Sequence, residues 1–198
     1  MNKKTIGIGI AALVIIIVIV IGVGYNSFVK LDENVKNKWS EVQSNYQRRQ
    51  DLVPSLVGIV KGGTDYERKT LVDVTEARAK AGQVNVAEPT FEGYQQKEKV
   101  EGNLTTNLNK VIAVVEKYPD LQSNNQFKTL QVQLEGTERR IKFARKDFNE
   151  AVMGYNNKAR SFPWNIVGGL LGFKPKAGFS ADGGAQNAPE VIFSDSTK

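Results

Sequence analysis

Apolar residues fill the first part of the chain without interruption, and beyond it they recur every three or four positions. No charged residue occurs from Thr5 to Val29, and residues 6–23 are almost wholly Ile, Val, Leu, Ala and Gly. At a rise of 1.5 Å per residue, about 20 helical residues cover about 30 Å, the thickness of a bilayer's hydrocarbon core. Residues 1–24 are therefore predicted to be an N-terminal flank and a transmembrane helix, which contacts the lipid bilayer through residues 6–24.

A cleaved signal peptide is the alternative interpretation, because Lys3 and Lys4 before an apolar core are typical of such peptides. The apolar run is longer than a typical signal-peptide core, and Gly22-Val23-Gly24 is a poor cleavage site. We therefore expect an uncleaved anchor. Basic residues crowd the N-terminal flank, so the positive-inside rule favours a cytoplasmic N-terminus and a soluble part on the exocytoplasmic side.

Four stretches of the soluble part carry the spacing of a helix. The first continues out of the anchor and contains Pro54, where we expect a kink near Arg49–Val53 or the start of a new helix. The second reaches about Ala81, and Thr64-Asp65-Tyr66-Glu67 is its predicted capping box. The apolar positions of the first stretch step by three and four residues: Phe28, Leu31, Val35, Trp39, Val42, Tyr46, Val53, Leu56 and Val60.

Two longer helices are predicted over about Thr90–Lys117 and Asn124–Arg160, with a turn at Tyr118-Pro119-Asp120 between them. The last has the most regular apolar seam: Phe127, Leu130, Leu134, Thr137, Ile141, Ala144, Phe148, Ala151, Tyr155 and Ala159. Long helices joined by short turns favour antiparallel neighbours. The predicted fold class is all-α, a single N-terminal transmembrane helix followed by an antiparallel up-down bundle of long helices. An extended coiled-coil dimer is the alternative for so long a seam.

The composition changes after Pro163. Residues Trp164–Phe173 form an apolar segment that is too short to span a bilayer. We expect this segment to pack against the bundle, and insertion into the membrane interface is the alternative. Residues 174–198 are rich in Gly, Ala and Ser and are expected to form a loose tail. The predicted organisation is a flank and anchor over 1–24, a helical-bundle domain over 25–163, and a short apolar segment with a flexible tail over 164–198.

The composition excludes several classes of chemistry. The 198 residues include no Cys and no His, and the net charge is +6. A thiol nucleophile, an imidazole base, a Ser-His-Asp triad and a mixed His/carboxylate metal site are therefore impossible. The positive charge is too diffuse to indicate nucleic-acid binding. We predict a protein that is not an enzyme, with no catalytic, cofactor-binding or metal-binding residues, no cofactor and no evident small-molecule substrate.

Four motifs follow one another along the chain: Tyr46-Gln47-Arg48-Arg49-x-Asp51-Leu52-Val53-Pro54, Glu76-Ala77-Arg78-Ala79, Glu116-x-Tyr118-Pro119-Asp120-Leu121, and a long one from Leu134-Glu135-Gly136-Thr137-Glu138 to Tyr155-Asn156. Their order and spacing resemble those of the LemA family over about Ile6 to Phe173. The resemblance implies a bacterial inner-membrane protein with one N-terminal span, a multihelical domain and no established enzymatic activity. Some relatives are associated with membrane compartments of magnetosome-forming bacteria, which suggests a membrane-organising role by analogy.

Charged residues inside these motifs fall close to the apolar seams: Arg48, Arg49, Arg78, Arg145, Glu76, Glu135 and Glu138. One interpretation is a polar or anion-binding site between helices. The favoured interpretation is a set of interhelical ion pairs that fixes the register. Asn149 and Asn156 lie seven residues apart, so they share one face of the last helix. They are expected to hydrogen-bond a turn or a neighbouring helix rather than a ligand.

The function predicted from these features is that of a single-pass, non-enzymatic helical-bundle protein of the bacterial inner membrane. It would act as an interaction or membrane-organising module, with an unknown protein partner or by self-association. A protein that binds or remodels the membrane surface, using its basic excess and Trp164–Phe173, is the first alternative. A carboxylate-dependent enzyme is the weaker alternative.

Overall fold

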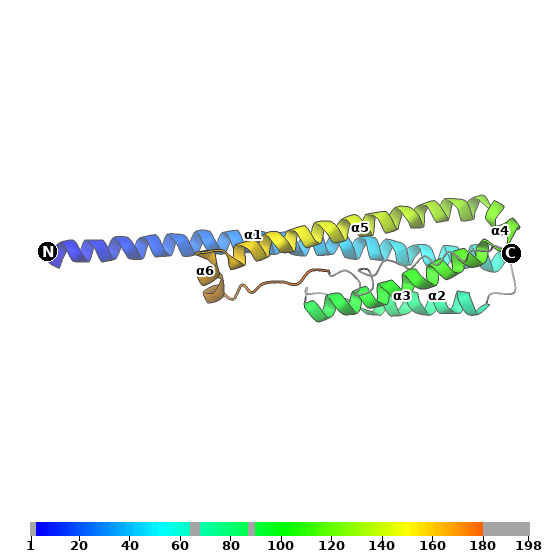
Figure 1. The fold of residues 1–198 in the computed structure, drawn as a ribbon, viewed down its shortest axis with the longest axis horizontal. Coiled ribbons are helices and arrows are strands. Elements are labelled where there is room, and N and C mark those ends of the chain that lie inside the picture. The colour runs from blue at the N-terminus through cyan, green and yellow to red at the C-terminus, as the bar shows by residue number, and fades with distance from the viewer. Residues whose placement is uncertain (1–2, 64–67, 87–89, 180–198) are drawn as a thin grey trace, which may run out of the picture.

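The computed structural model describes residues 3–63, 68–86 and 90–179. These residues form six helices and no strand: α1 (Lys3–Gly63), α2 (Arg68–Gln83), α3 (Phe91–Val115), α4 (Pro119–Ser123), α5 (Asn125–Arg160) and α6 (Trp164–Leu171). The four longest run alternately up and down the bundle, with α2 and α3 flanking only the half farther from the N-terminus (Figure 1). The all-α fold class with an antiparallel bundle is therefore confirmed. The predicted capping box at Thr64–Glu67 lies outside the described residues.

One uninterrupted helix, α1, contains both the predicted anchor and the first helix of the bundle (Figure 1). Its most apolar window of 18 residues has a mean hydropathy of 3.3 and is not buried by any other part of the structure. Among the residues that the structure describes, one helix is thus long and apolar enough to span a membrane, and it lies near the N-terminus. The part of α1 before Gly24 projects beyond the other described helices, and most of its side chains are exposed (Figure 1).

Pro54 lies inside α1, so the alternative of a new helix starting there is wrong. A proline has no backbone N–H, so it leaves the carbonyl four residues earlier without its helical donor. That carbonyl belongs to Gln50, and it accepts a hydrogen bond of 2.8 Å from Nε of Arg78 in α2. A neighbouring helix therefore supplies the hydrogen bond that Pro54 removes, and Val53 and Leu56 on either side of it remain buried.

The core has two parts that follow one another along the bundle. The proximal core, nearer the candidate span, is rich in aromatic residues: Phe28, Val35, Trp39, Val42, Tyr46, Val86, Tyr94, Ile141, Ala144, Phe148, Ala151, Val152, Tyr155 and Ala159. The distal core is almost wholly aliphatic: Val53, Leu56, Val60, Val74, Ala77, Ala81, Leu104, Leu108, Val111, Val115, Leu121, Phe127, Leu130 and Leu134. Every residue of the seam predicted for the last helix is buried in α5.

The chain turns back after α5 and packs α6 against α1 at the point where the candidate span ends. A methyl group added at Gly24 would lie 2.8 Å from the ring of Trp164, so α6 approaches α1 very closely there. Gly168 approaches the ring of Phe28 in the same way. Phe173, just beyond α6, stacks on Phe28 with ring centroids 4.8 Å apart. These contacts fix α6 beside residues 24–28.

The segment that follows α6 was expected to be loose from residue 174 onward, but residues 174–179 lie extended along the bundle. We call these residues the C-terminal strap. Its backbone pairs with two side chains of α5, and the ring of Phe179 packs into the proximal core. Composition alone failed here because the ordering contacts come from α5 and not from the segment itself. Residues 180–198 lie outside the described residues.

Candidate functional site in a buried polar layer

A layer of buried polar side chains separates the proximal core from the distal core. Its members are Arg49 and Gln50 of α1, Lys97 and Glu101 of α3, and Thr137 of α5. Each helix brings them inward because they continue its apolar face: on α3, for example, the layer residues fall between the buried residues Tyr94 and Leu104. We call this group the polar layer.

Arg49 links three helices through one guanidinium group. Its Nη2 donates to Oε2 of Glu101 at 2.5 Å and to the carbonyl of the same residue at 3.2 Å. Its Nη1 donates to Oγ1 of Thr105 in α3 and to Oε1 of Glu138 in α5, each at 2.6 Å. The Arg49 side chain is only 2% exposed, so these bonds replace its lost hydration.

Glu101 is the acidic centre of the layer, with a side chain that is also 2% exposed. Besides Arg49, its carboxylate accepts a hydrogen bond of 2.7 Å from Nε2 of Gln50 and lies 3.2 Å from Nζ of Lys97. Lys97 in turn donates to the carbonyls of Ala81 and Val84 at 2.8 and 3.0 Å, which close the C-terminal end of α2. The layer therefore joins all four long helices, and the Lys97–Ala81 and Arg78–Gln50 bonds are its links to α2.

Burial and neighbouring charges shift the pKa of Arg49 and of two nearby tyrosines. Burial lowers the pKa of the Arg49 guanidinium, but the charges and hydrogen bonds of Glu138 and Glu101 outweigh burial and raise the pKa above its ordinary value. Burial raises the pKa of the Tyr46 phenol to about 12, so Tyr46 stays neutral at physiological pH. Burial also raises the pKa of Tyr94, whose hydroxyl is buried without a hydrogen-bond partner within the described part of the chain.

A groove of about 690 Å³ opens beside the polar layer, between α1, α3 and α5. Arg145 of α5 and Glu98 of α3 form an ion pair across it. Its charged lining residues balance, three positive (Arg49, Lys99 and Arg145) against three negative (Glu98, Glu101 and Glu138). A balanced lining produces little net attraction for an anion or a cation. The arrangement is therefore that of interhelical ion pairs, which hold three helices in one register.

The structure brings together some of the charged residues that the motifs singled out. Arg49, Arg145 and Glu138 line the groove, and Arg78 binds the carbonyl of Gln50 nearby. The others do not join them: Arg48, Glu76 and Glu135 are exposed. Among the residues that the structure describes, no group of three or more acidic side chains is placed to hold a metal ion.

Lys97, Glu101 and Gln50 were missed as members of the site. The signal was present, because Lys97 and Glu101 occupy positions where the apolar face of α3 should continue between Tyr94 and Leu104. A charged residue at such a position needs a partner on a facing helix. Which partner it finds depends on the relative heights of three helices, and helical spacing alone does not determine those.

Asn149 and Asn156 do share one face of α5, and both bind the C-terminal strap. Each side chain makes a pair of hydrogen bonds with one strap residue. Asn149 accepts from the backbone N–H of Phe179 at 2.8 Å and donates to its carbonyl at 3.1 Å. Asn156 makes the same pair with Lys176, at 2.8 and 2.7 Å. Their partner is an extended segment, and not the turn or helix that was expected.

The polar layer and the strap lie in a part of the chain that matches a known protein family. The profile of the LemA family matches residues 38–193, which is most of the chain. The chain belongs to the LemA family. The match includes the polar layer, the groove and both asparagines that hold the strap, so these features lie in the part of this LemA-family protein that the family pattern covers.

Individual relatives include magnetosome proteins. The chain is 27% identical over 169 residues to magnetosome protein MamQ 1 and to MamQ 2 of Paramagnetospirillum magneticum, covering 76% of this chain and 62% of each relative. It is 24% identical over 161 residues to the protein LemA of Metamycoplasma hominis, covering 80% of this chain and 70% of that protein. The chain thus spans less than two thirds of the length of the MamQ proteins.

Proposed function

We propose that this LemA-family protein is a non-enzymatic, membrane-anchored scaffold that organises a protein partner, or further copies of itself, at the surface of the bacterial inner membrane. The observation that carries this proposal is the unbroken helix α1, which joins the candidate span to the bundle core. The helix continues without a break from the span into the bundle, and α6 packs against it at Gly24 and Phe28, so the bundle stands at a nearly fixed direction to its anchor. Such rigidity suits a protein that holds a partner at a set distance from lipid.

The dimensions of α1 support this role. From Tyr25 to Gly63 the helix rises about 60 Å at 1.5 Å per residue, so the bundle presents a long side wall to its surroundings. The charged side chains of the polar layer, Arg49, Lys97 and Glu101, pair with one another and so stabilise the bundle that α1 carries. The membrane-organising role is also supported by analogy with relatives named as magnetosome proteins.

The outer face of α5 is the surface that we assign to the partner. Val132, Phe143 and Met153 are exposed along it, although such residues are usually buried. Exposed basic residues lie among them, including Arg139, Lys142 and Lys146, together with fewer acidic ones, of which Glu150 lies 3.5 Å from Lys146. Exposed apolar residues surrounded by charged ones are typical of binding surfaces, and the excess of positive charge favours an acidic partner.

Site-specific photo-crosslinking in native membranes tests the scaffold role. A photoreactive amino acid replaces Phe143, and a matched variant carries it at Lys110, an exposed position of α3. We expect one recurrent adduct from position 143, either a single protein species or a second copy of this chain, and no such adduct from position 110. Identical mixtures of abundant bystanders from both positions would contradict the proposal.

We further propose that the bundle lies on the exocytoplasmic side, with the N-terminus in the cytoplasm. Lys3 and Lys4 support this orientation, because positive residues beside a span tend to stay inside. A reporter that is active only outside the cytoplasm, fused after Lys198, should be active. A cytoplasmic signal would reverse the orientation and leave the scaffold proposal intact.

A further inference from the structure

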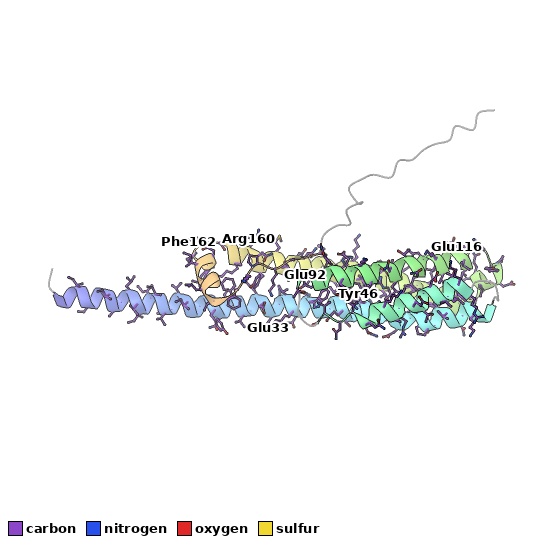
Figure 2. All side chains as sticks on the ribbon, turned by 90° about the horizontal axis from the view of Figure 1, so that it is seen from below. Glu33, Tyr46, Glu92, Glu116, Arg160 and Phe162 are labelled. Carbon is purple, nitrogen blue, oxygen red and sulfur yellow. The ribbon has the colours of Figure 1, made fainter. Side chains whose placement is uncertain are left out.

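Several large apolar side chains gather at the proximal end of the bundle without a partner in the structure. They are Phe162 in the turn before α6, and Ile166, Leu170 and Leu171 on α6. Phe162 and Leu170 are 80% and 79% exposed, which is unusual for residues of this size. Figure 2 shows Phe162 on the side of this end that faces away from α1. We call these four residues the α6 patch.

The height of the α6 patch along α1 follows from the contacts of α6. Trp164 and Val167 contact Gly24, Gly168 contacts Phe28, and Phe173 stacks on Phe28. The uncharged apolar run of α1 ends at the same point, since residues 6–23 are almost wholly aliphatic. When this run fills the hydrocarbon core, residues 24–28 lie in the head-group region. α6 must then lie in that region too.

The direction of α6 also suits a membrane surface. α6 contacts α1 at Gly24 and Phe28. It crosses α1 rather than running along it, as both views show (Figures 1 and 2). With α1 upright in the bilayer, α6 lies near the membrane plane. Ile166 and Leu170 are four residues apart, so they share one exposed side of it.

Charge at this end of the bundle suits the head groups of acidic lipids. No acidic residue occurs between Glu150 and Asp182 in the sequence, whereas Lys158, Arg160 and Lys174 flank the α6 patch. Nζ of Lys158 lies 3.6 Å from the centre of the Trp164 ring, which places a cation beside an indole. Trp with Lys or Arg is the combination that proteins place at lipid head groups.

We propose that α6 is an interfacial membrane helix, whose patch of Phe162, Ile166, Leu170 and Leu171 inserts into the bilayer at the boundary between head groups and acyl chains. The span holds α6 at the surface, so even a weak affinity suffices, because the second contact is intramolecular. Insertion of α6 gives the bundle a second attachment point, which restrains its rotation about α1. This inference goes beyond the scaffold role, since it holds whichever partner the bundle binds.

Fluorescence at single positions tests this assignment, because the chain has no natural Cys and one introduced Cys carries a unique label. The full chain is reconstituted in phosphatidylcholine–phosphatidylglycerol vesicles with an environment-sensitive dye at Leu170→Cys. Val132→Cys is the matched control, an apolar residue of α5 that is 64% exposed, and Val18→Cys in the span is the lipid reference. Circular dichroism confirms that each labelled variant is folded.

We expect the label at position 170 to be quenched by nitroxide-bearing acyl chains and protected from aqueous iodide, like that at position 18. The label at position 132 should show the reverse. A label at position 170 that behaves like the one at 132 would overturn the proposal. Protection from both quenchers, together with disulfide-linked dimers of the unlabelled Leu170→Cys variant under oxidising conditions, would also overturn it, because a second copy would then cover the patch.

The unsubstituted chain provides an independent measurement. It has two tryptophans, Trp39 in the proximal core and Trp164 in α6. Brominated acyl chains should quench the Trp164 fraction of the emission, and the Trp164→Phe variant should lose that fraction while Trp39 emission is unaffected. Equal emission in brominated and ordinary lipid would contradict insertion of α6 even if the labelled variants failed to fold.

Discussion

The proximal and distal cores are filled by different kinds of side chain. The distal core lies among four long helices, and aliphatic side chains fill the space between them. In the proximal core α2 and the larger part of α3 are absent, and only α1 and α5 run its full length (Figure 1). Here rings fill the space: Trp39, Tyr94, Phe148 and Phe179 contact one another with centroids 4.6 to 5.9 Å apart.

The difference shows how the space beside two helices can be filled without further helices. Aromatic rings bury more surface per residue than aliphatic chains, and the strap adds backbone groups that Asn149 and Asn156 satisfy. The proximal half therefore depends on a segment far along the sequence, whereas the distal half depends on neighbouring helices. Three changes should separate the two halves experimentally.

The largest effect is expected from Glu101→Leu in the polar layer between the two cores. The change takes the carboxylate away from Arg49, Lys97 and Gln50 and leaves Arg49 with Thr105, Glu138 and the backbone carbonyl of residue 101, so the free energy of unfolding should fall by about 3–5 kcal/mol. Chemical denaturation of the full chain in mild detergent, followed by circular dichroism, measures this loss. Glu138→Leu is the matched control: its side chain is 43% exposed, so its loss should be nearer about 1 kcal/mol.

Replacing Arg49, Lys97 and Glu101 together by Met, Met and Leu should restore most of that stability, because no buried charge is then left without a partner. The two cores would then be one continuous apolar core. If the triple variant were less stable than Glu101→Leu alone, the polar layer would contribute net stability, and its interpretation as a device that mainly fixes register would be wrong.

A smaller effect, confined to the proximal half, is expected from Asn149→Ala and Asn156→Ala. Each change removes two hydrogen bonds to the strap, so each should lower the free energy of unfolding by about 1–2 kcal/mol. Hydrogen exchange should become faster at residues 174–179 and stay unchanged around the distal core. Asn157→Ala is the control, an exposed asparagine on the same helix. Unchanged exchange in the strap would contradict the role assigned to both asparagines.

The smallest effect concerns Asp32, which joins α1 to the strap through Lys176 at 2.7 Å and also pairs with Lys36 at 3.0 Å. Burial raises the pKa of Asp32, but the hydrogen bonds and charges of Lys176 and Lys36 outweigh burial, and the net shift is below the ordinary value of 3.8. A lowered pKa in the folded state stabilises the fold above pH 3.8, and this stabilisation disappears as the pH falls through the folded-state pKa.

Asp32→Asn should therefore cost about 0.5–1 kcal/mol at pH 7, and the difference from the natural chain should shrink as the pH falls below 3.8 and through the folded-state pKa of Asp32. Denaturation of both proteins at pH 7 and over a series of acidic pH values measures it. A difference that persisted undiminished at acidic pH would show that the carboxylate charge is not what holds the strap to α1.

Helical spacing predicted the long helices and the seam of α5 well, because a stripe that recurs over ten turns has only one regular structure that buries it. The same spacing did not show whether the helix would continue through Pro54. It does continue, and Arg78 donates to the carbonyl of Gln50, which Pro54 leaves without its helical donor. The five-residue helix α4 was predicted only as a turn, which differs from a short helix by very few hydrogen bonds.

The site was predicted in part for a related reason. Arg49, Arg145 and Glu138 could be recognised as charges beside a seam, but their partners Glu101 and Glu98 lie on a helix whose height relative to α1 and α5 the spacing does not determine. The strap was missed altogether. Its six residues carry no helical or strand spacing of their own, and they become ordered because α5 presents two amide groups at matching intervals.

Because α1 is unbroken, any tilt of the span also tilts the whole bundle. A tilt of the span by about 20°, an ordinary response to bilayer thickness, would move the far end of a rigid 60 Å rod sideways by about 20 Å. Small changes in the thickness of the surrounding lipid therefore become large displacements of the surface that lies farthest from it. A hinge near Gly24 would absorb such movements, and a stiff helix transmits them.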